Sequence, residues 1–352
     1  MSLKEAVNRN YFVILISILI SFVLYITFTQ TWNKDAVKYY DTNRRHEQLN
    51  IHKCFKTLWD RKAFSDFIRN NTTENGGNIS TYRESSCNHF IKLASPGGRT
   101  GNQLFQIAAL FGISFEYDFI PIIEPSFPLS KYFDLPNVSK VKLSNSSICT
   151  SQFPGIFYKC FNRSENDKAF NMTLNGYFQS WKYFKNSADI IRTVLKIRPR
   201  YMQNAKLFLQ FHKKDGFKNI CIHVRRTDMA DKSLARKGYA AAPISFIYKA
   251  IQFCEVNFKK AIFFVLSDDI KWCRKNIKRN VIFSSFTDPG NDLALMTSCD
   301  HVVVTAGSFG WWGAWLSNGT AVYFNGYPRP GTKAEAEYIR EDYYPPDWIG
   351  LS

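Results

Sequence analysis

Short apolar runs alternate with helix-like segments along the second half of this 352-residue chain. Strands are expected at residues 219–224, 261–266, 281–285, 301–305 and 321–324, and helices at 244–258, 268–277, 292–299 and 309–317. This alternation predicts a parallel sheet with helical crossover connections. Because ligands of such sheets bind beyond the carboxyl ends of the strands, three loops are expected to form the functional site: 223–228, 266–269 and 305–312.

A glycine-rich stretch lies within the first strand–helix–strand unit. The sequence SPGGRTGNQLFQIAALFGI (95–113) follows an expected strand at 89–94 and precedes another at 119–124; the topology of 125–185 stays open. The helix expected from about Asn102 to Tyr117 has an apolar face of Leu104, Ile107, Ala108, Phe111 and Phe115. Free N–H groups at a helix N-terminus bind phosphate, but the stretch is neither a P-loop nor a Gly-x-Gly-x-x-Gly motif. The alternative is a turn whose glycines need positive φ angles.

An uncharged apolar segment lies near the N-terminus. No charged residue occurs between Asn10 and Asn33, and YFVILISILISFVLYITFT (11–29) fills most of this span, which is long enough to cross a bilayer core. No small-residue cleavage site is obvious. We therefore expect a cytoplasmic tail at 1–10, an uncleaved transmembrane signal anchor at 11–31, and a polar stem at 32–85 before the folded part.

Glycosylation signals and cysteines occur only downstream of the predicted anchor. Sequons lie at Asn70, Asn71, Asn78, Asn137, Asn145, Asn162, Asn171 and Asn318, a density that indicates a glycosylated lumenal domain. All eight cysteines also follow the anchor, an even number that fits oxidising surroundings, and none has a metal-binding Cys-x-x-Cys spacing. The net charge of +17 favours an anionic partner. A lumenal or extracellular location removes nucleic acid from the candidates.

Two consecutive arginines follow the first strand of the second half, in HVRRTD (223–228). Guanidinium groups offer paired planar donors that fit phosphate and stay charged at any working pH. Strand alternation sends His223 and Arg225 to one side and Arg226 to the other, so we expect one arginine to meet a ligand. The other is expected to be structural, paired with Asp228. The alternative is an ordinary surface salt bridge.

Two further loops carry candidate groups. In TAGSFGWW (305–312), Gly307 and Ser308 lead into a helix and present another run of free N–H groups. The Trp311–Trp312 pair is interpreted as core packing, with an aromatic platform for a sugar as the alternative. The two carboxylates of LSDD (266–269) suit either a divalent metal or a helix cap, and no histidine cluster supports the metal.

Four motifs together resemble the α-1,2-fucosyltransferases of the Golgi. They are GGRTGNQLFQ, HVRRTD, FFVLSDDIKWCRKNI and DLALMTSCDHVVVTAGSFGWWGAWLS, and the similarity covers roughly residues 88–325. The resemblance implies an α/β, GT-B-like fold of two Rossmann-like lobes around a donor-nucleotide cleft. It also implies a type II Golgi membrane protein and inverting transfer of L-fucose from GDP-fucose to the 2-hydroxyl of a terminal galactose-type residue, without a metal or other cofactor. The last motif departs from the commonest Ser-Thr-Phe-Ser-Trp-Trp pattern, which concerns acceptor preference more than donor use.

The resemblance also implies roles for individual residues. An N-terminal, acceptor-side lobe is expected at 86–215 and a GDP-fucose-binding lobe at 216–352. Arg225 is expected to hold the β-phosphate, with Asp228 as the candidate base. The other expected donor-binding residues are His223 and Asp292 near the guanine, and Gly98, Gly101, Asn102, Gln103, Ser308 and Phe309.

Two other functions stay open at this point. One is a different GDP-fucose-dependent enzyme, such as a protein O-fucosyltransferase, which shares similar arginine motifs. The other is a membrane-anchored glycan-binding ectodomain without turnover. Assays of GDP-fucose hydrolysis and transfer separate the binding protein from the enzymes, and the linkage of the product separates the two enzymes.

Overall fold

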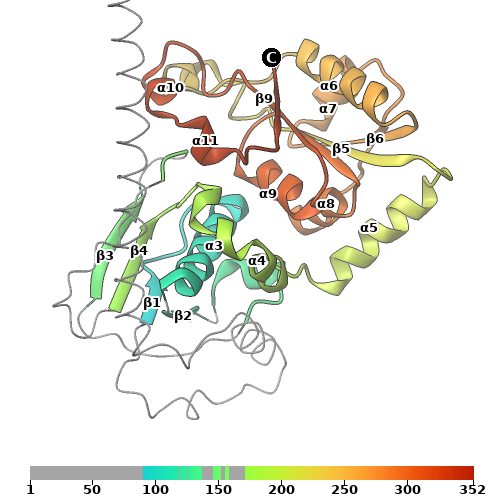
Figure 1. Ribbon diagram of the computed structural model, residues 1–352. Coiled ribbons are helices and arrows are strands. Elements are labelled where there is room, and N and C mark those ends of the chain that lie inside the picture. Colours follow the sequence, from blue (N-terminus) through green and yellow to red (C-terminus); the bar gives the residue numbers. More distant parts are fainter. Residues whose placement is uncertain (1–89, 118, 125, 137–145, 152–154, 158–170) are drawn as a thin grey trace, which may run out of the picture. The chain divides into compact units, whose positions relative to one another are not determined.

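Two parallel sheets organise the part of the chain that the structure describes (Figure 1). The computed structural model describes residues 90–117, 119–124, 126–136, 146–151, 155–157 and 171–352. All of these residues belong to one unit, Asp60–Ser352. The fold is therefore of the mixed α/β class with parallel sheets, as the sequence predicted.

The first sheet has four strands in the order β2-β1-β4-β3, and all its neighbouring strands are parallel. Its strands are β1 (Phe90–Leu93), β2 (Ile120–Ile122), β3 (Ser146–Ser151) and β4 (Asn171–Gly176). β1 and β2 are the strands predicted on either side of the first helix. β3 and β4 belong to the region whose topology the sequence left open.

The second sheet has six strands in the order β10-β9-β8-β5-β6-β7, again all parallel. Its strands are β5 (Lys218–Val224), β6 (Ala261–Ser267), β7 (Ile282–Phe283), β8 (His301–Val304), β9 (Ala321–Phe324) and β10 (Ile349–Leu351). The five strands predicted in this half are confirmed, although β7 is shorter than expected, and β10 is additional. The chain runs outward from β5 through β6 to β7 and returns to start again at β8, so the strand order reverses between β5 and β8.

Helices fill the connections. The α-helices are α3 (Thr100–Tyr117), α4 (Ala188–Val194), α5 (Pro199–Phe211), α6 (Ile244–Asn257), α7 (Ile270–Asn276), α8 (Pro289–Thr297), α9 (Ser308–Ser317), α10 (Lys333–Glu337) and α11 (Arg340–Tyr343). The 3-10 helices are η2 (Pro128–Lys131), η3 (Trp181–Tyr183), η4 (Lys185–Ser187) and η5 (Lys232–Lys237). The helices predicted in the second half correspond to α6, α7, α8 and α9.

The alternation of side chains along β5 divides the layers around the second sheet. Ile220, Ile222 and Val224 belong to the hydrophobic cluster that α6 and α7 complete. Cys221 and His223 point the other way, toward α8 and α9. Because successive side chains of a strand face opposite sides, one short sequence supplies both a core face and a face toward the candidate site.

Helix α3 is buried on almost every side, which corrects the prediction of a single apolar face. Burial runs without a break from Gln103 to Ser114, whereas Phe115, assigned to the apolar face, is only half-buried. The Phe105 ring centroid lies 4.5 Å from that of Trp311 and 5.1 Å from that of Trp312. Helix α3 is therefore covered by α9 as well as by its own sheet. The two tryptophans are fully buried, so the core-packing interpretation is confirmed.

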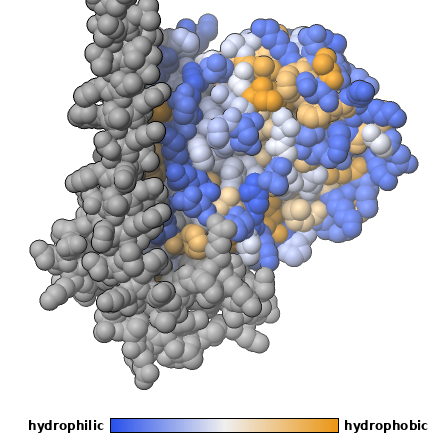
Figure 2. Space-filling view, in the orientation of Figure 1, coloured by the Kyte–Doolittle hydropathy of each residue, from blue (hydrophilic) through white to orange (hydrophobic). Residues whose placement is uncertain are grey.

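Hydrophilic side chains cover most of the described surface on the face that Figure 2 shows, with scattered hydrophobic patches. Within the described ranges, no helix has the length and apolarity needed to cross a bilayer. The predicted tail (1–10), anchor (11–31) and stem (32–85) lie outside those ranges.

Candidate active site

The loops after β5 and β8 meet where the strand order reverses. The backbone N–H of Arg225 donates to Thr305 Oγ1 at 2.9 Å, and the N–H of Thr305 donates to the carbonyl of His223 at 3.1 Å. A reversal of strand order leaves a crevice at the carboxyl ends of the strands, because the two connections leave to opposite sides. Two of the three loops predicted from the sequence therefore meet at this crevice.

Arg225 lies at this strand-order reversal in a fixed orientation. Its Nε donates to Asp228 Oδ1 at 2.8 Å and its Nη2 contacts Asp228 Oδ2, and its side chain is only 16% exposed. Gly307, at φ +85°, precedes α9, and a Cβ there would lie 2.8 Å from Arg225 Cδ. Glycine at this position therefore leaves the room that the arginine occupies beside the start of α9.

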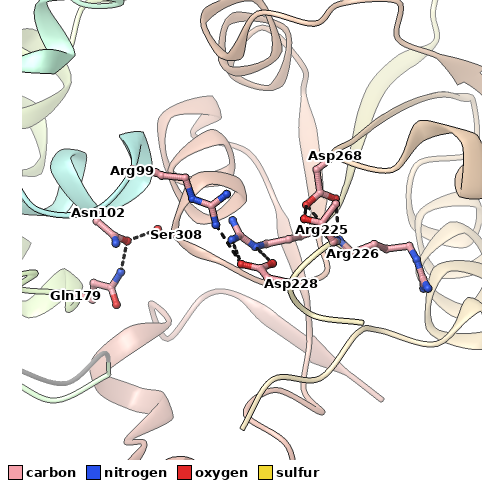
Figure 3. Close-up of polar contacts among 9 residues, drawn as sticks. Arg99, Asn102, Gln179, Arg225, Arg226, Asp228, Asp268 and Ser308 are labelled. Carbon is pink, nitrogen blue, oxygen red and sulfur yellow. Dashed lines mark hydrogen bonds and ion pairs between the residues drawn. The ribbon is translucent and has the colours of Figure 1, made fainter. Parts of the chain in front are cut away.

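Asp228 is shared by two arginines. Arg99, from the glycine-rich stretch, donates from Nη2 to Asp228 Oδ2 at 3.1 Å (Figure 3). Burial alone would raise the pKa of the Asp228 carboxyl, but the hydrogen bonds and charge of Arg225, and the charge of Arg99, hold the pKa below its usual value. Burial would likewise lower the pKa of the Arg225 guanidinium, and Asp228 raises it above its ordinary value. Both groups are charged at neutral pH.

The pairing of the two consecutive arginines differs from the prediction, which gave Asp228 to the structural one. Asp228 pairs with Arg225 because the chain turns after the strand: the N–H of Ala230 donates to the carbonyl of Arg226, which brings residue 228 back beside 225. Arg226 leaves on the other side, and its guanidinium carbon lies 3.7 Å from the ring centroid of Trp272. The separation of the two arginines is as predicted.

The two aspartates of the 266–269 loop have separate structural partners. Asp269 caps α7 by accepting from the N–H of Trp272 at 3.1 Å, as the capping interpretation predicted. Asp268 instead accepts from the N–H of Arg226 at 2.8 Å and from Thr227 Oγ1 at 2.6 Å, which ties down the arginine loop. Among the residues that the structure describes, no group of three or more His, Cys, Asp or Glu side chains is arranged to hold a metal ion.

His223 is buried beneath the first turn of α9. A Cβ on Gly310 would lie 2.5 Å from His223 Nδ1, and the Phe309 ring centroid lies 5.6 Å from that of the imidazole. Burial lowers the pKa of His223 to about 4, with Arg225 adding to the effect and Asp268 opposing it. The imidazole is therefore neutral at physiological pH, and its buried Nδ1 has no hydrogen-bond partner among the described residues.

Asp292 lies on the first turn of α8, where its N–H donates to the carbonyl of Asp288. Burial, assisted by the charge of Asp288, raises the pKa of Asp292 to about 7. A half-buried carboxyl that titrates near neutral pH is a candidate functional group, because its charged form lacks a compensating cation. No hydrogen bond or ion pair between described side chains connects Asp292 to the arginine–aspartate cluster.

The glycine-rich stretch meets the start of α9. A Cβ on Gly101 would lie 2.4 Å from the backbone nitrogen of Phe309 and 2.6 Å from Ser308 Oγ, so only glycine permits this approach. Gly98 adopts a φ of +67°, which confirms that this part of the stretch needs a positive φ. Gln103 Nε2 donates to the carbonyl of Gly98 at 3.1 Å. The N-termini of α3 and α9, whose first N–H groups have no partner within the helix, therefore lie side by side.

Asn102 connects three segments of the chain. Its Oδ1 accepts from Ser308 Oγ at 2.7 Å and from Gln179 Nε2 at 2.7 Å (Figure 3). Because Oδ1 accepts from two donors, the orientation of the Asn102 amide is determined. Its Nδ2 faces the turn at Gly98, and a Cβ on Gly98 would lie 2.2 Å from this nitrogen. The side-chain N–H groups of Asn102 are therefore directed toward the glycine-rich turn.

The model of glycosyl transferase family 11 matches residues 91–352. The chain belongs to this family. The prediction made from the four motifs is thereby confirmed.

Several galactoside fucosyltransferases are similar to this family 11 chain. Cattle galactoside 2-alpha-L-fucosyltransferase SEC1 is 28% identical over 188 residues, which are 51% of each chain. Mouse Sec1 is 26% identical over 269 residues, 72% of each chain, and rabbit galactoside alpha-(1,2)-fucosyltransferase 2 is 26% identical over 270 residues, 72% of this chain and 75% of the relative. The match thus spans about half the length of the cattle relative and about three quarters of the others.

Solved structures show a more distant similarity. An Arabidopsis thaliana FUT1 variant in complex with GDP aligns over 74% of this chain and 78% of its own, with a TM-score of 0.48 and 10% identity. POFUT1 in complex with GDP-fucose aligns over 68% of this chain and 99% of its own, with a TM-score of 0.44 and 13% identity.

Sequence reasoning missed two polar residues of the candidate site. Arg99 stands within the glycine-rich stretch, but nothing local indicated that it would reach Asp228, which is 129 residues away. Gln179 lies in the region of open topology and follows Phe178, a fully buried residue with a φ of +52°. Left-handed backbone at a bulky residue is strained and concentrates at functional sites, but it is invisible in the sequence.

A groove of about 610 Å³ lies away from these residues. It runs along α5 and is bounded by Asn219, at the amino end of β5, and by Ser298. None of the predicted site residues lines this groove.

Proposed function

We propose that this chain is a galactoside α-1,2-fucosyltransferase. It would transfer L-fucose from GDP-β-L-fucose, with inversion at the anomeric carbon, to the 2-hydroxyl of a terminal galactose-type residue on a glycoprotein or glycolipid glycan. Family membership and the activities named for the relatives support this proposal. The observation that carries the mechanism is the fixed position of Arg225 at the strand-order reversal, beside the N-terminus of α9.

Arg225 is proposed to bind the β-phosphate of the donor. As the bond between the fucose anomeric carbon and the phosphate oxygen breaks, its electron pair stays on GDP and negative charge grows on that oxygen. A guanidinium already held by Asp228 stabilises this charge without reorganising. The N-terminus of α9, which begins at Ser308, adds partial positive charge from the backbone on the same side.

The opposite side of the cleft is proposed to come from the glycine-rich stretch. Gly98, Gly101, Asn102 and Gln103 would face the diphosphate and fucose, with the amide of Asn102 as a donor of hydrogen bonds. His223, Asp292 and Phe309 would lie near the nucleotide. The neutral imidazole of His223 suits an uncharged ring edge better than a phosphate, because its low pKa leaves it without charge.

Asp228 is proposed to orient Arg225. It also remains the sequence-based candidate for the base that takes the proton of the acceptor hydroxyl. Its lowered pKa and its two arginine partners favour the orienting role, because a good general base has a pKa near the working pH.

The architecture proposed for the whole chain is GT-B-like, with an N-terminal, acceptor-side lobe at 86–215 and a GDP-fucose-binding lobe at 216–352. The transmembrane anchor at 11–31 and the stem at 32–85 would hold both lobes in the Golgi lumen. Two of the sequons have described asparagines: Asn318 is exposed at the end of α9, and Asn171 begins β4 and accepts from the N–H of Phe90. The other sequons, at Asn70, Asn71, Asn78, Asn137, Asn145 and Asn162, lie outside the described residues.

The test compares Arg225→Ala and Arg225→Lys with the wild-type full-length chain in detergent, measuring GDP release and fucose transfer to a panel of galactosides. Loss of the paired donors is expected to cost ~3 kcal/mol of transition-state stabilisation, roughly a hundredfold in rate. Lysine keeps the charge but not the planar fork, so Arg225→Lys is expected to recover little activity. Arg226→Ala is the matched control and is expected to reduce stability, through its contact with Trp272, rather than donor binding.

The linkage of the product then separates the candidate functions. An α-1,2 linkage to galactose supports the proposal, whereas fucose on a protein hydroxyl indicates O-fucosylation. Binding of GDP-fucose without any transfer would favour a glycan-binding protein. A folded Arg225→Ala protein with near wild-type turnover would contradict the assignment of the site.

A further inference from the structure

Two buried thiols meet behind the candidate nucleotide site. Cys221 lies on β5, on the face toward α8, and Cys299 follows the C-terminal end of α8. Both are buried, at 0% and 3% exposure, and their Sγ atoms are 2.8 Å apart. Cys221 Sγ also lies 3.7 Å from the carbonyl oxygen of Leu295 on α8.

This separation is unusually small for two groups that are not bonded. Nonbonded carbon atoms attract most strongly at ~3.5–4.0 Å, and sulfur atoms are larger than carbon. A bonded pair of sulfurs, by contrast, lies at ~2.05 Å. The fold therefore already holds the two sulfur atoms closer than ordinary packing would place them, with no atom between them.

The chain carries a disulfide elsewhere, because Cys149 is disulfide-bonded. Disulfides form and persist where the surroundings are oxidising. A second pair of adjacent thiols in the same protein experiences the same conditions while the chain folds. The other two described free thiols, Cys254 and Cys273, are also buried, but neither contacts a cysteine among the described residues. They provide an internal comparison.

We propose that Cys221 and Cys299 form an intramolecular disulfide. Each thiol loses its proton, the two sulfurs share a new bond, and the two electrons pass to the disulfide of an oxidising protein or small disulfide, which is reduced to two thiols. Because both sulfurs are enclosed in the folded protein, the exchange takes place as the chain folds. The bond closes a loop of roughly 80 residues and ties β5 to the end of α8.

This bond lies behind the residues that the proposed function assigns to the donor nucleotide. β5 ends at Val224, between His223 and Arg225, and α8 carries Asp292. A covalent connection between the two elements would fix their spacing. Only this consequence rests on the proposed function; the bond itself does not.

The test is a disulfide map of the full-length chain produced through the secretory pathway. The protein is denatured without reductant, alkylated, digested and examined by mass spectrometry. A linked pair of peptides containing Cys221 and Cys299 is expected, with alkyl groups on Cys254 and Cys273. Alkylation of Cys221 and Cys299 to the same extent as the comparison pair, or linkage of either one to another cysteine, would overturn the proposal.

A stability measurement supplements the map. The double variant Cys221→Ala/Cys299→Ala is expected to melt ~5–15 °C below the wild type. Reductant is expected to lower the melting temperature of the wild type by breaking this bond and the disulfide of Cys149. In the double variant, reductant is expected to have only the effect that comes from the disulfide of Cys149. The control variant Cys254→Ala loses a buried thiol of the same kind without losing a bond, and is expected to keep the full response to reductant. An equal response in the double variant and the wild type would contradict the proposal, whatever the enzyme does with GDP-fucose.

Discussion

Replacing Asp228 with asparagine separates the two roles that this carboxylate can have. The substitution keeps the shape of the side chain but removes its charge and leaves one donor group facing the guanidinium of Arg225. If Asp228 orients Arg225, the arginine stays in the site but is held less firmly. If Asp228 is the general base, the asparagine cannot accept the proton of the acceptor hydroxyl and transfer stops.

The expected magnitude follows from the geometry of the pair. Asp228 accepts from both Nε and Nη2 of Arg225, and the two side chains are 24% and 16% exposed, so solvent screens the pair only in part. Hydrogen bonds to charged groups contribute about 1.5–3 kcal/mol, and the lower half of this range fits a partly exposed pair. The expected loss in kcat is therefore about 10–50-fold. Binding of GDP is expected to change little, because losing the orientation and losing a negative charge beside the phosphates act in opposite directions.

The assay measures kcat and KM for GDP-fucose from pH 5 to 9, with thermal melts of each variant. Asp231→Asn is the matched control, because this exposed carboxylate of the same loop caps η5 and is not paired with an arginine. The lowered pKa of Asp228 means that its contribution to stability is present above the unfolded pKa of ~3.9 and is lost as the pH falls through the folded pKa. A loss of kcat beyond a thousandfold, with disappearance of the acid limb of the pH profile, would refute the orienting role and make Asp228 the base.

Three further outcomes are expected. Gln179→Glu should lower kcat about tenfold, because a carboxylate cannot donate to Asn102 Oδ1 and the side-chain amide of Asn102 would flip. The control Ser180→Ala, in the same loop, should lower only the melting temperature, and equal losses of kcat in the two variants would contradict the prediction. Since burial raises the pKa of Asp292 to about 7, the wild type should lose stability as the pH rises from about 4 to 7. Asp292→Asn should have a higher melting temperature than the wild type at pH 8 and the same melting temperature at pH 4. In calorimetry, this variant should bind GDP more weakly than the wild type. Transfer should persist in excess chelator, because the carboxylates of the 266–269 loop already have structural partners; loss of activity with rescue by Mn²⁺ would restore the metal interpretation.

The sequence alone predicted the parts of this protein that depend on neighbours along the chain. Alternation of apolar runs and helical segments predicted the strands from β5 to β9. A carboxylate at Asp268 or Asp269 before a helix suggested a cap, and Asp269 supplies it. The loops at the carboxyl edge were predicted for the same reason, and the left-handed turn at Gly98 corresponds to the alternative interpretation of the glycine-rich stretch. Backbone conformation, capping and strand periodicity are set within a few residues, so local patterns report them.

The tertiary structure alone decided which of these local features meet. Nothing local in the sequence indicated that β5 and β8 are neighbours, that Asn102 bonds to Ser308, 206 positions away, or that Cys221 faces Cys299. It also paired Asp228 with the wrong arginine, because the turn after β5 reverses the chain within three residues. Contacts between distant segments depend on how whole layers pack, and many different packings are compatible with the same local pattern. The strand order and the helix packing therefore place the groups of the candidate site against one another.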